Sequence, residues 1–184
     1  MNLPNSLTLL RLLLVPFFVL FFNVPYFRTP TGSILLVLFF LFTSLTDMVD
    51  GYLARSRSQV TSFGKFLDPV ADKILIISVL ILLVEEGRVQ AWMAIIIISR
   101  EFIVTGLRLI ASHAGVVIAA ESLGKYKMFF QSVSICFLIL IADARFYFYE
   151  IGIAFLMLSI VFSLYSAGQY FMKYGVRMEL IKAQ

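Results

Sequence analysis

Four aspartates in one part of the chain have the residue type and the spacing of a metal-binding site. Asp47 and Asp50 are three residues apart. Asp68 and Asp72 are four residues apart. On helices, residues at these spacings share one face. The polar stretch 55–62 would join two antiparallel helices and return the second pair to the depth of the first. We therefore expect the four carboxylates to converge.

Converging carboxylates at this depth need a cation. The apolar run 74–84 is only about 16 Å of helix, about half a hydrocarbon core, so a membrane span there must extend back to Asp72. Two like charges 4 Å apart repel by about 4 kcal/mol at an effective dielectric near 20. Arg55 and Lys73 are the nearby cations in the sequence. A divalent ion is the better neutraliser, and ligands that are all oxygen favour Mg²⁺ or Mn²⁺.

Each aspartate taken alone also has a structural interpretation. Asp68 directly precedes Pro69, so it could be an N-cap followed by a proline in the first helical turn. Asp47 and Asp50 could be solvated residues at a helix end. The combined spacing of all four favours the metal site. Small residues at Gly51, Ala54 and Gly64 would let a flat ligand or a neighbouring backbone come close, although each is equally a helix-packing residue.

Composition indicates the element type that must position these residues. The chain of 184 residues is 61% hydrophobic and 14% charged, with a mean hydropathy of +0.97. These values predict an all-α integral membrane protein that forms one domain over residues 1–184. We expect about six transmembrane helices, with an amphipathic N-terminal segment at the interface and no cleaved signal. The helices are expected near 5–23, 31–55, 62–86, 90–112, 123–142 and 148–173.

The distribution of basic residues predicts that both termini are cytoplasmic. In that orientation the outer side holds only Arg28, Arg88 and Arg145. The inner side and inner halves of the spans hold Arg11, Arg55, Arg57, Lys65, Lys73, Arg100, Arg108, Lys125, Lys127, Lys173, Arg177 and Lys182. In so apolar a chain, the net charge of +4 suits anionic lipid headgroups and phosphorylated substrates rather than nucleic acid. Cys136 is the single cysteine, which excludes a disulfide framework.

The aspartate stretch resembles the signature of the CDP-alcohol phosphotransferases. The matching positions are Asp47, Asp50, Gly51, Ala54, Arg55, Gly64, Asp68 and Asp72. In that family the signature binds the diphosphate of a CDP-activated donor through divalent metal, and an acceptor hydroxyl displaces CMP. The resemblance implies Asp47, Asp50 and Asp68 as ligands of two divalent ions. It implies Asp72 as general base and possible ligand. Gly51 and Arg55 would contact the nucleotide and its phosphates, with Thr61 a weaker candidate.

Further segments resemble the bacterial phosphatidylglycerophosphate synthase branch of the family. These are the segments 5–11, 66–73, 100–108 and 124–127; Met128 stands where that branch has threonine. The resemblance implies CDP-diacylglycerol as donor, glycerol 3-phosphate as acceptor, and a homodimer in the cell membrane with its active site facing the cytoplasm. The signature is shared with enzymes for other acceptors, so inositol phosphate and serine are the alternatives.

Four basic residues in the fourth and fifth expected helices are candidates for binding the acceptor's phosphate. Arg100 and Arg108 are two turns apart, and Lys125 and Lys127 begin the next helix. The structural alternative is that topology alone demands basic residues at inner helix ends. We also expect Asn5 and Thr8 to contact the donor, against an N-capping role for Asn5.

Proteins of a different class also place carboxylates inside a helical membrane bundle. A cation transporter or channel is the rival interpretation. The acidic group lies at one face of the expected bundle, and no comparable group continues a path across the bilayer. The pattern therefore favours a metal-dependent transferase.

Overall fold

The computed structural model describes residues 3–56, 62–113, 123–140 and 145–172, and the side chains of 12–45, 73–111, 126–140 and 147–172. Helices make up nearly all of this part of the chain. The elements are α1 (Leu3–Asn23), the 3₁₀ helix η1 (Pro25–Arg28), α2 (Pro30–Ser56), α3 (Ser62–Glu85), α4 (Ala91–His113), α5 (Leu123–Ile139) and α6 (Arg145–Tyr170). The expectation of an all-helical fold with six long helices is confirmed.

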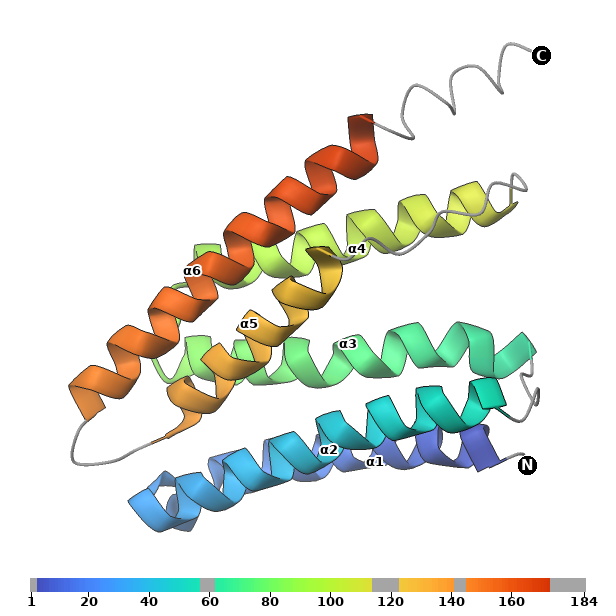
Figure 1. The fold of residues 1–184 in the computed structure, drawn as a ribbon. Helices are drawn as coiled ribbons and strands as arrows, with labels where there is room; N and C mark the ends of the chain where they lie inside the picture. The colour runs from blue at the N-terminus through green and yellow to red at the C-terminus, as the bar shows by residue number, and fades with distance from the viewer. Residues whose placement is uncertain (1–2, 57–61, 114–122, 141–144, 173–184) are drawn as a thin grey trace.

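The helices run up and down in one bundle (Figure 1). The helix α1 packs against both α2 and α3, and α4 packs against α3 and α6. The last two helices, α5 and α6, lie side by side along their length, and α5 also contacts α2 and α3. As a result α2 ends, α3 begins and α6 ends at the same end of the bundle. We call this the site end.

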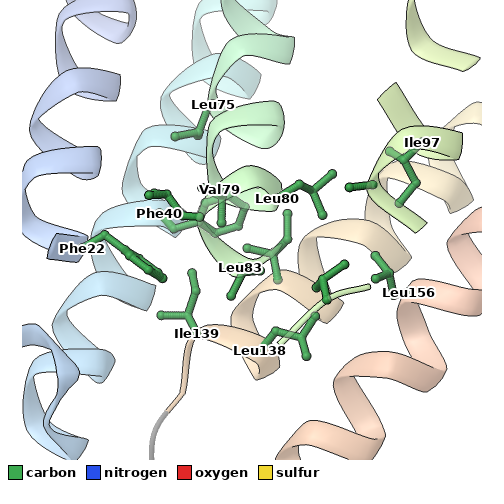
Figure 2. Packing of buried hydrophobic residues seen from close by; sticks show 14 of the residues in the cluster. Phe22, Phe40, Leu75, Val79, Leu80, Leu83, Ile97, Leu138, Ile139 and Leu156 are labelled. Carbon is green, nitrogen blue, oxygen red and sulfur yellow. The ribbon is translucent and has the colours of Figure 1, made fainter. Parts of the chain in front are cut away.

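All six helices contribute to one apolar core. Figure 2 shows Phe22 of α1 and Phe40 of α2 beside Val79 of α3, with Ile139 of α5 below them. The core continues to Ile97 of α4 and Leu156 of α6. Because this core ties α2 and α3 to the same neighbours, it fixes the two helices that carry the aspartates.

Large apolar side chains also cover the outside of the bundle. Phe42, Ile95, Phe102 and Val161 are each about 60% exposed. In the part of the chain with described side chains, Tyr147–Tyr170 is long and apolar enough to cross a membrane, and shorter apolar stretches occupy α1, α2 and α5. An apolar exterior of this kind is typical of a protein surrounded by lipid. The number of crossings and the side of the termini stay predictions.

The start of α2 is fixed by an N-cap at Thr29, a residue type that favours this position. Thr29 precedes Pro30, and the backbone N–H of Gly32 donates to the Thr29 hydroxyl at 3.1 Å. This is the N-cap arrangement with proline in the first turn. A Cβ at Gly32 would lie 2.2 Å from the carbonyl oxygen of Tyr26, so only glycine lets η1 pack this closely.

The turn between α3 and α4 is closed by a Schellman motif. Gly87 has φ +69°, its N–H donates to the carbonyl of Val84 at 3.0 Å, and Arg88 N–H donates to the carbonyl of Leu83 at 2.9 Å. The turn leaves Arg88 buried next to the end of α5. Its Nη1 donates to the carbonyls of Leu138 at 2.8 Å and Ile139 at 3.1 Å.

This contact corrects the expected boundaries of α5. The helix was expected to reach residue 142 but ends at Ile139. Arg88 satisfies carbonyls of the last turn, so the helix has a partner at this end that no local sequence signal reveals. The helix α6 correspondingly begins at Arg145 rather than at 148. The expected N-terminal interfacial segment has no element of its own in the described residues, because α1 runs without a break from Leu3 to Asn23.

Candidate functional site

Both aspartate pairs lie on helices, as their spacing predicted. Asp47 and Asp50 are in α2, which ends at Ser56, and Asp68 and Asp72 are in α3, which begins at Ser62. At 1.5 Å per residue, Asp50 and Asp68 each lie about 9 Å from these adjoining helix ends, and Asp47 and Asp72 lie about 14–15 Å from them. The two pairs therefore lie at matching distances from the helix ends that the segment 57–61 joins. Their side chains lie outside the described residues, so convergence of the carboxylates stays a prediction.

The other expected donor contacts lie on the same helix ends. Gly51, Ala54 and Arg55 are in the last turns of α2, Gly64 is in the first turn of α3, and Asn5 and Thr8 are in the first turns of α1. The side chains of these residues, and Thr61 as a whole, lie outside the described part of the chain. Their contacts with a donor stay predictions.

A polar contact links α3 to α4 close to the aspartates. The ammonium group of Lys73, the residue after Asp72, donates to the hydroxyl of Thr105. That hydroxyl in turn donates to the backbone carbonyl of Glu101 at 2.7 Å. Along α4, Arg108 is about 4.5 Å and Arg100 about 7.5 Å from Thr105 in opposite directions. Because α3 and α4 run in opposite directions, the contact places Arg108 toward the end of the bundle that carries the aspartates, whereas Arg100 lies on the other side of Thr105, farther from them.

Arg100 is buried and points toward α6. Its Nε donates to the backbone carbonyl of Ser163 at 3.1 Å, and its Nη2 donates to the hydroxyl of Ser166 at 3.1 Å. Its Nη1 donates to Oε1 of Glu101 at 2.8 Å. The planar guanidinium has further N–H groups, and among the described residues no acceptor is assigned to them. Arg100 is therefore held in one orientation with donor groups to spare.

Lys127 of α5 reaches the same carboxylate. The residue is 3% exposed, and its ammonium group forms an ion pair with Oε1 of Glu101. The hydroxyl of Ser159 donates to the backbone carbonyl of Lys127 at 3.3 Å, which fixes α5 against α6 at this level. Two of the four predicted phosphate-binding residues, Arg100 and Lys127, are thus brought together on one oxygen atom.

The other two predicted phosphate-binding residues are Arg108 and Lys125, of which the structure describes only the Arg108 side chain. The guanidinium carbon of Arg108 lies 5.6 Å from the ring centroid of Tyr170, a cation–π contact. Lys125 is in the first turn of α5, and its side chain lies outside the described residues. Arg108 is half-buried in the last turns of α4, which ends at His113.

Sequence reasoning missed the contribution of α6 to this site. Ser159, Ser166 and Tyr170 contact the basic residues of α4 and α5 through their side chains, and Ser163 contacts Arg100 through its backbone carbonyl. Their spacing of four, three and four residues puts them on one helix face. In a helix this apolar, that polar stripe is the signal that would have identified the partner of Arg100.

A cavity at the opposite end of the bundle is not the predicted site. It has a volume of about 410 Å³ and is lined by Glu86, Gly87, Arg88, Phe137, Leu138, Leu140 and Tyr149. Glu86 pairs with Arg28 at 2.8 Å and with Arg88 at 3.6 Å. We call these three residues the far-end ion-pair cluster. Their charges hold η1, the α3–α4 turn and the end of α5 together.

The chemistry of the aspartates fits a hard divalent ion. Both pairs offer oxygen donors at helical spacings, on two helices that the short segment 57–61 joins. Among the residues with described side chains, no group of three or more His, Cys, Asp or Glu is placed to hold a metal ion. The candidate ligands are therefore still the four aspartates.

Residues 1–165 match the CDP-alcohol phosphatidyltransferase family. The match covers most of the chain and both helices that carry the aspartates. The chain belongs to this family of membrane enzymes.

Relatives from several bacteria share a more particular name. The chain is 45% identical over 148 residues to a CDP-diacylglycerol–glycerol-3-phosphate 3-phosphatidyltransferase of Bacillus subtilis (strain 168), covering 76% of this chain and 77% of that one. It is 40% identical over 139 residues to the protein of the same name from Rickettsia bellii (strain RML369-C), covering 76% and 75%. A third relative of that name, from Haemophilus influenzae, is 46% identical over 110 residues, covering 58% and 57%.

Proposed function

We propose that this enzyme transfers a phosphatidyl group from CDP-diacylglycerol to glycerol 3-phosphate, which gives phosphatidylglycerophosphate and CMP. The observation that carries the proposal is the 45% identity, over three quarters of both chains, to a relative with this activity in its name. The pairing of two buried cations on Glu101, one turn along α4 from the residue that contacts Lys73, supports it independently, because an acceptor that carries a phosphate needs such a group nearby.

The donor half of the site is the pair of helix ends α2 and α3. Asp47, Asp50 and Asp68, with Asp72 as a possible further ligand, would hold divalent ions there. When bound, Mg²⁺ or Mn²⁺ neutralises charge on the diphosphate and stabilises the departing CMP. Arg55 contributes a further positive charge toward the donor phosphates. Gly51, Ala54 and Gly64 leave room for the nucleotide, and Asn5, Thr8 and Thr61 complete its contacts.

The acceptor half is the basic cluster of α4 and α5. Arg100, Arg108, Lys125 and Lys127 bind the phosphate of glycerol 3-phosphate. Arg100 is pre-oriented by Ser163 and Ser166, so it loses little side-chain freedom when it binds the acceptor. The contact between Lys73 and Thr105 holds α4 beside α3 at this level. The acceptor hydroxyl is thereby directed toward the donor phosphorus.

The chemical step is a displacement at phosphorus. Asp72 takes the proton from the acceptor hydroxyl as that oxygen forms a bond to the phosphorus bearing diacylglycerol. The bond between this phosphorus and the oxygen of CMP breaks, and CMP leaves with the bonding electrons. No other oxidant, reductant or co-reactant is needed.

The setting of the reaction follows from the charge distribution and from the family resemblance. The excess of basic residues at the site end supports a cytoplasmic active site in the cell membrane, with six helices crossing the bilayer and both termini inside. The far-end ion-pair cluster contains two of the three arginines assigned to the outer side, in agreement with that orientation. A homodimer is implied by the resemblance to the family.

The acceptor is tested with purified protein, CDP-diacylglycerol and Mg²⁺. Glycerol 3-phosphate, serine and inositol phosphate are supplied in turn, and CMP and the lipid product are measured. We expect glycerol 3-phosphate to give the highest kcat/KM. Equal or better turnover with serine or inositol phosphate would overturn the acceptor assignment, and metal flux into vesicles without CMP release would favour a transporter.

A further inference from the structure

We propose that Glu101 is a positioning residue for the acceptor phosphate. Its carboxylate holds the guanidinium of Arg100 and the ammonium group of Lys127 together, so that the acceptor meets the two cations as a preformed pair. This inference rests on the proposed function, which assigns Arg100 and Lys127 to the acceptor phosphate.

The carboxylate of Glu101 lies between two buried cations. Arg100 is 9% exposed and Lys127 is 3% exposed, yet both charged groups contact the same Oε1 atom of Glu101. Two buried cations this close would repel each other strongly without an anion between them. The three side chains together still carry a net positive charge, so the group attracts a phosphate while the pair stays assembled.

Glu101 also links two helices through these cations. Arg100 is held by the carbonyl of Ser163 and the hydroxyl of Ser166 as well as by Glu101. Its orientation therefore has support from α6 that does not depend on Glu101. Lys127 comes from a different helix, and its ion pair with Glu101 joins α5 to α4. Loss of the carboxylate should break this link and leave two buried like charges without their shared anion, while Arg100 stays attached to α6.

The position of Arg100 and Lys127 relative to Asp72 is set by a contact between α4 and α3. Thr105 lies one turn after Glu101 on α4, and its hydroxyl both donates to the Glu101 carbonyl and accepts from Lys73. Lys73 directly follows Asp72. The segment of α4 that carries Glu101 is thereby fixed along the bundle axis against α3. The pair of Arg100 and Lys127 therefore has a defined position along the bundle axis relative to α3, the helix that carries Asp72.

The test compares Glu101→Gln with the wild-type enzyme in detergent. Glutamine keeps the size of the side chain but removes the charge. We expect the KM for glycerol 3-phosphate to rise about tenfold or more, with the KM for CDP-diacylglycerol unchanged and kcat at saturation within about threefold. Glu101→Asp keeps the charge on a shorter side chain, and its acceptor KM should fall between those of the wild type and Glu101→Gln.

Two further variants separate positioning from a general structural effect. Glu86→Gln removes the carboxylate of the far-end ion-pair cluster, and it should lower thermal stability without changing the acceptor KM. Lys127→Met should raise the acceptor KM, and the double variant with Glu101→Gln should be little worse than Lys127→Met alone, because Glu101 acts through Lys127.

The outcomes distinguish this inference from the proposed function. Wild-type protein that releases no CMP in the presence of glycerol 3-phosphate would overturn the proposed function itself. Wild-type protein that is active, with an acceptor KM unchanged in Glu101→Gln, would overturn the positioning role alone. A lower acceptor KM in Glu101→Gln would also overturn it, because the carboxylate would then be competing with the phosphate. If Glu101→Gln does not fold, an unchanged acceptor KM in Glu101→Asp has the same meaning.

Discussion

At the scale of single residues, the acidic and the basic side chains have different proposed roles. The aspartates of α2 and α3 are assigned to metal and proton transfer because carboxylates at helical spacing suit both tasks. The basic residues of α4 and α5 are assigned to the acceptor because Arg100 and Lys127 meet on Glu101, and Arg100 and Arg108 contact α6. Each assignment predicts a different kinetic effect when a residue is replaced.

Replacement of the proposed base should affect chemistry more than binding. In Asp72→Asn the side chain keeps its size but cannot take the acceptor proton, so kcat should fall by about 10²- to 10⁴-fold. Binding of CDP-diacylglycerol, measured by equilibrium titration in the presence of Mg²⁺, should be close to that of the wild type. Glu150→Gln, an exposed carboxylate on α6, is the control and should leave kcat unchanged. If Asp72→Asn loses donor binding, Asp72 is mainly a metal ligand.

At the scale of elements, long-range contacts decide where helices end and how they are held. Arg88 comes from the turn after α3 but satisfies the last carbonyls of α5. It also pairs with Glu86, which pairs with Arg28, the last residue of η1. These contacts join η1, the α3–α4 turn and the end of α5 at the end of the bundle that lies away from the aspartates.

Removal of this helix cap should lower stability and spare catalysis. Arg88→Met leaves the carbonyls of Leu138 and Ile139 without their donor in a buried setting, which should cost about 1–3 kcal/mol. Thermal unfolding in detergent measures the change, and kcat per folded molecule should stay the same. Arg28→Met is the matched control, because the Arg28 side chain is 51% exposed and its ion pair should be worth about 0–1 kcal/mol. If the thermal unfolding midpoint of Arg88→Met equals that of the wild type, Arg88 is not a cap of α5.

The sequence predicted the six helices well, because runs of apolar residues between polar breakers mark them directly. The cap at Thr29 and the turn at Gly87 are local signals of the same kind. The end of α5 was placed three residues too late, since the donor that caps it is fifty residues away in the chain. The partners of Arg100 were missed for the same reason, because Ser163 and Ser166 become neighbours only after α4 and α6 pack.

At the scale of the whole molecule, the two ends of the bundle have different tasks. One end carries the end of α2, the start of α3 and the end of α4 with Arg108, whereas Arg100 lies deeper, nearer the start of α4 than its end. The other end carries the far-end ion-pair cluster and the cavity beside it. The apolar exterior between them suits a lipid environment, where a lipid donor could reach the site from within the bilayer.

We expect the reaction to depend on divalent metal bound by the whole assembled site. Removal of metal with EDTA should reduce CMP release to background, because four carboxylates would then repel each other and the donor diphosphate. Addition of excess Mg²⁺ or Mn²⁺ should restore the rate. Thermal unfolding measured on the same samples shows whether the protein stays folded during the treatment. Full activity after complete metal removal would contradict the assignment of the aspartates as ligands.

The transfer step itself can be followed with oxygen isotopes. Purified enzyme is given CDP-diacylglycerol and glycerol 3-phosphate that carries ¹⁸O in its acceptor hydroxyl, and both products are analysed by mass spectrometry. If the hydroxyl oxygen attacks the phosphorus that bears diacylglycerol, the label will appear in phosphatidylglycerophosphate, and unlabelled CMP will form in equal amount. Label in CMP, or CMP release that does not depend on glycerol 3-phosphate, would contradict phosphatidyl transfer as the reaction of this protein.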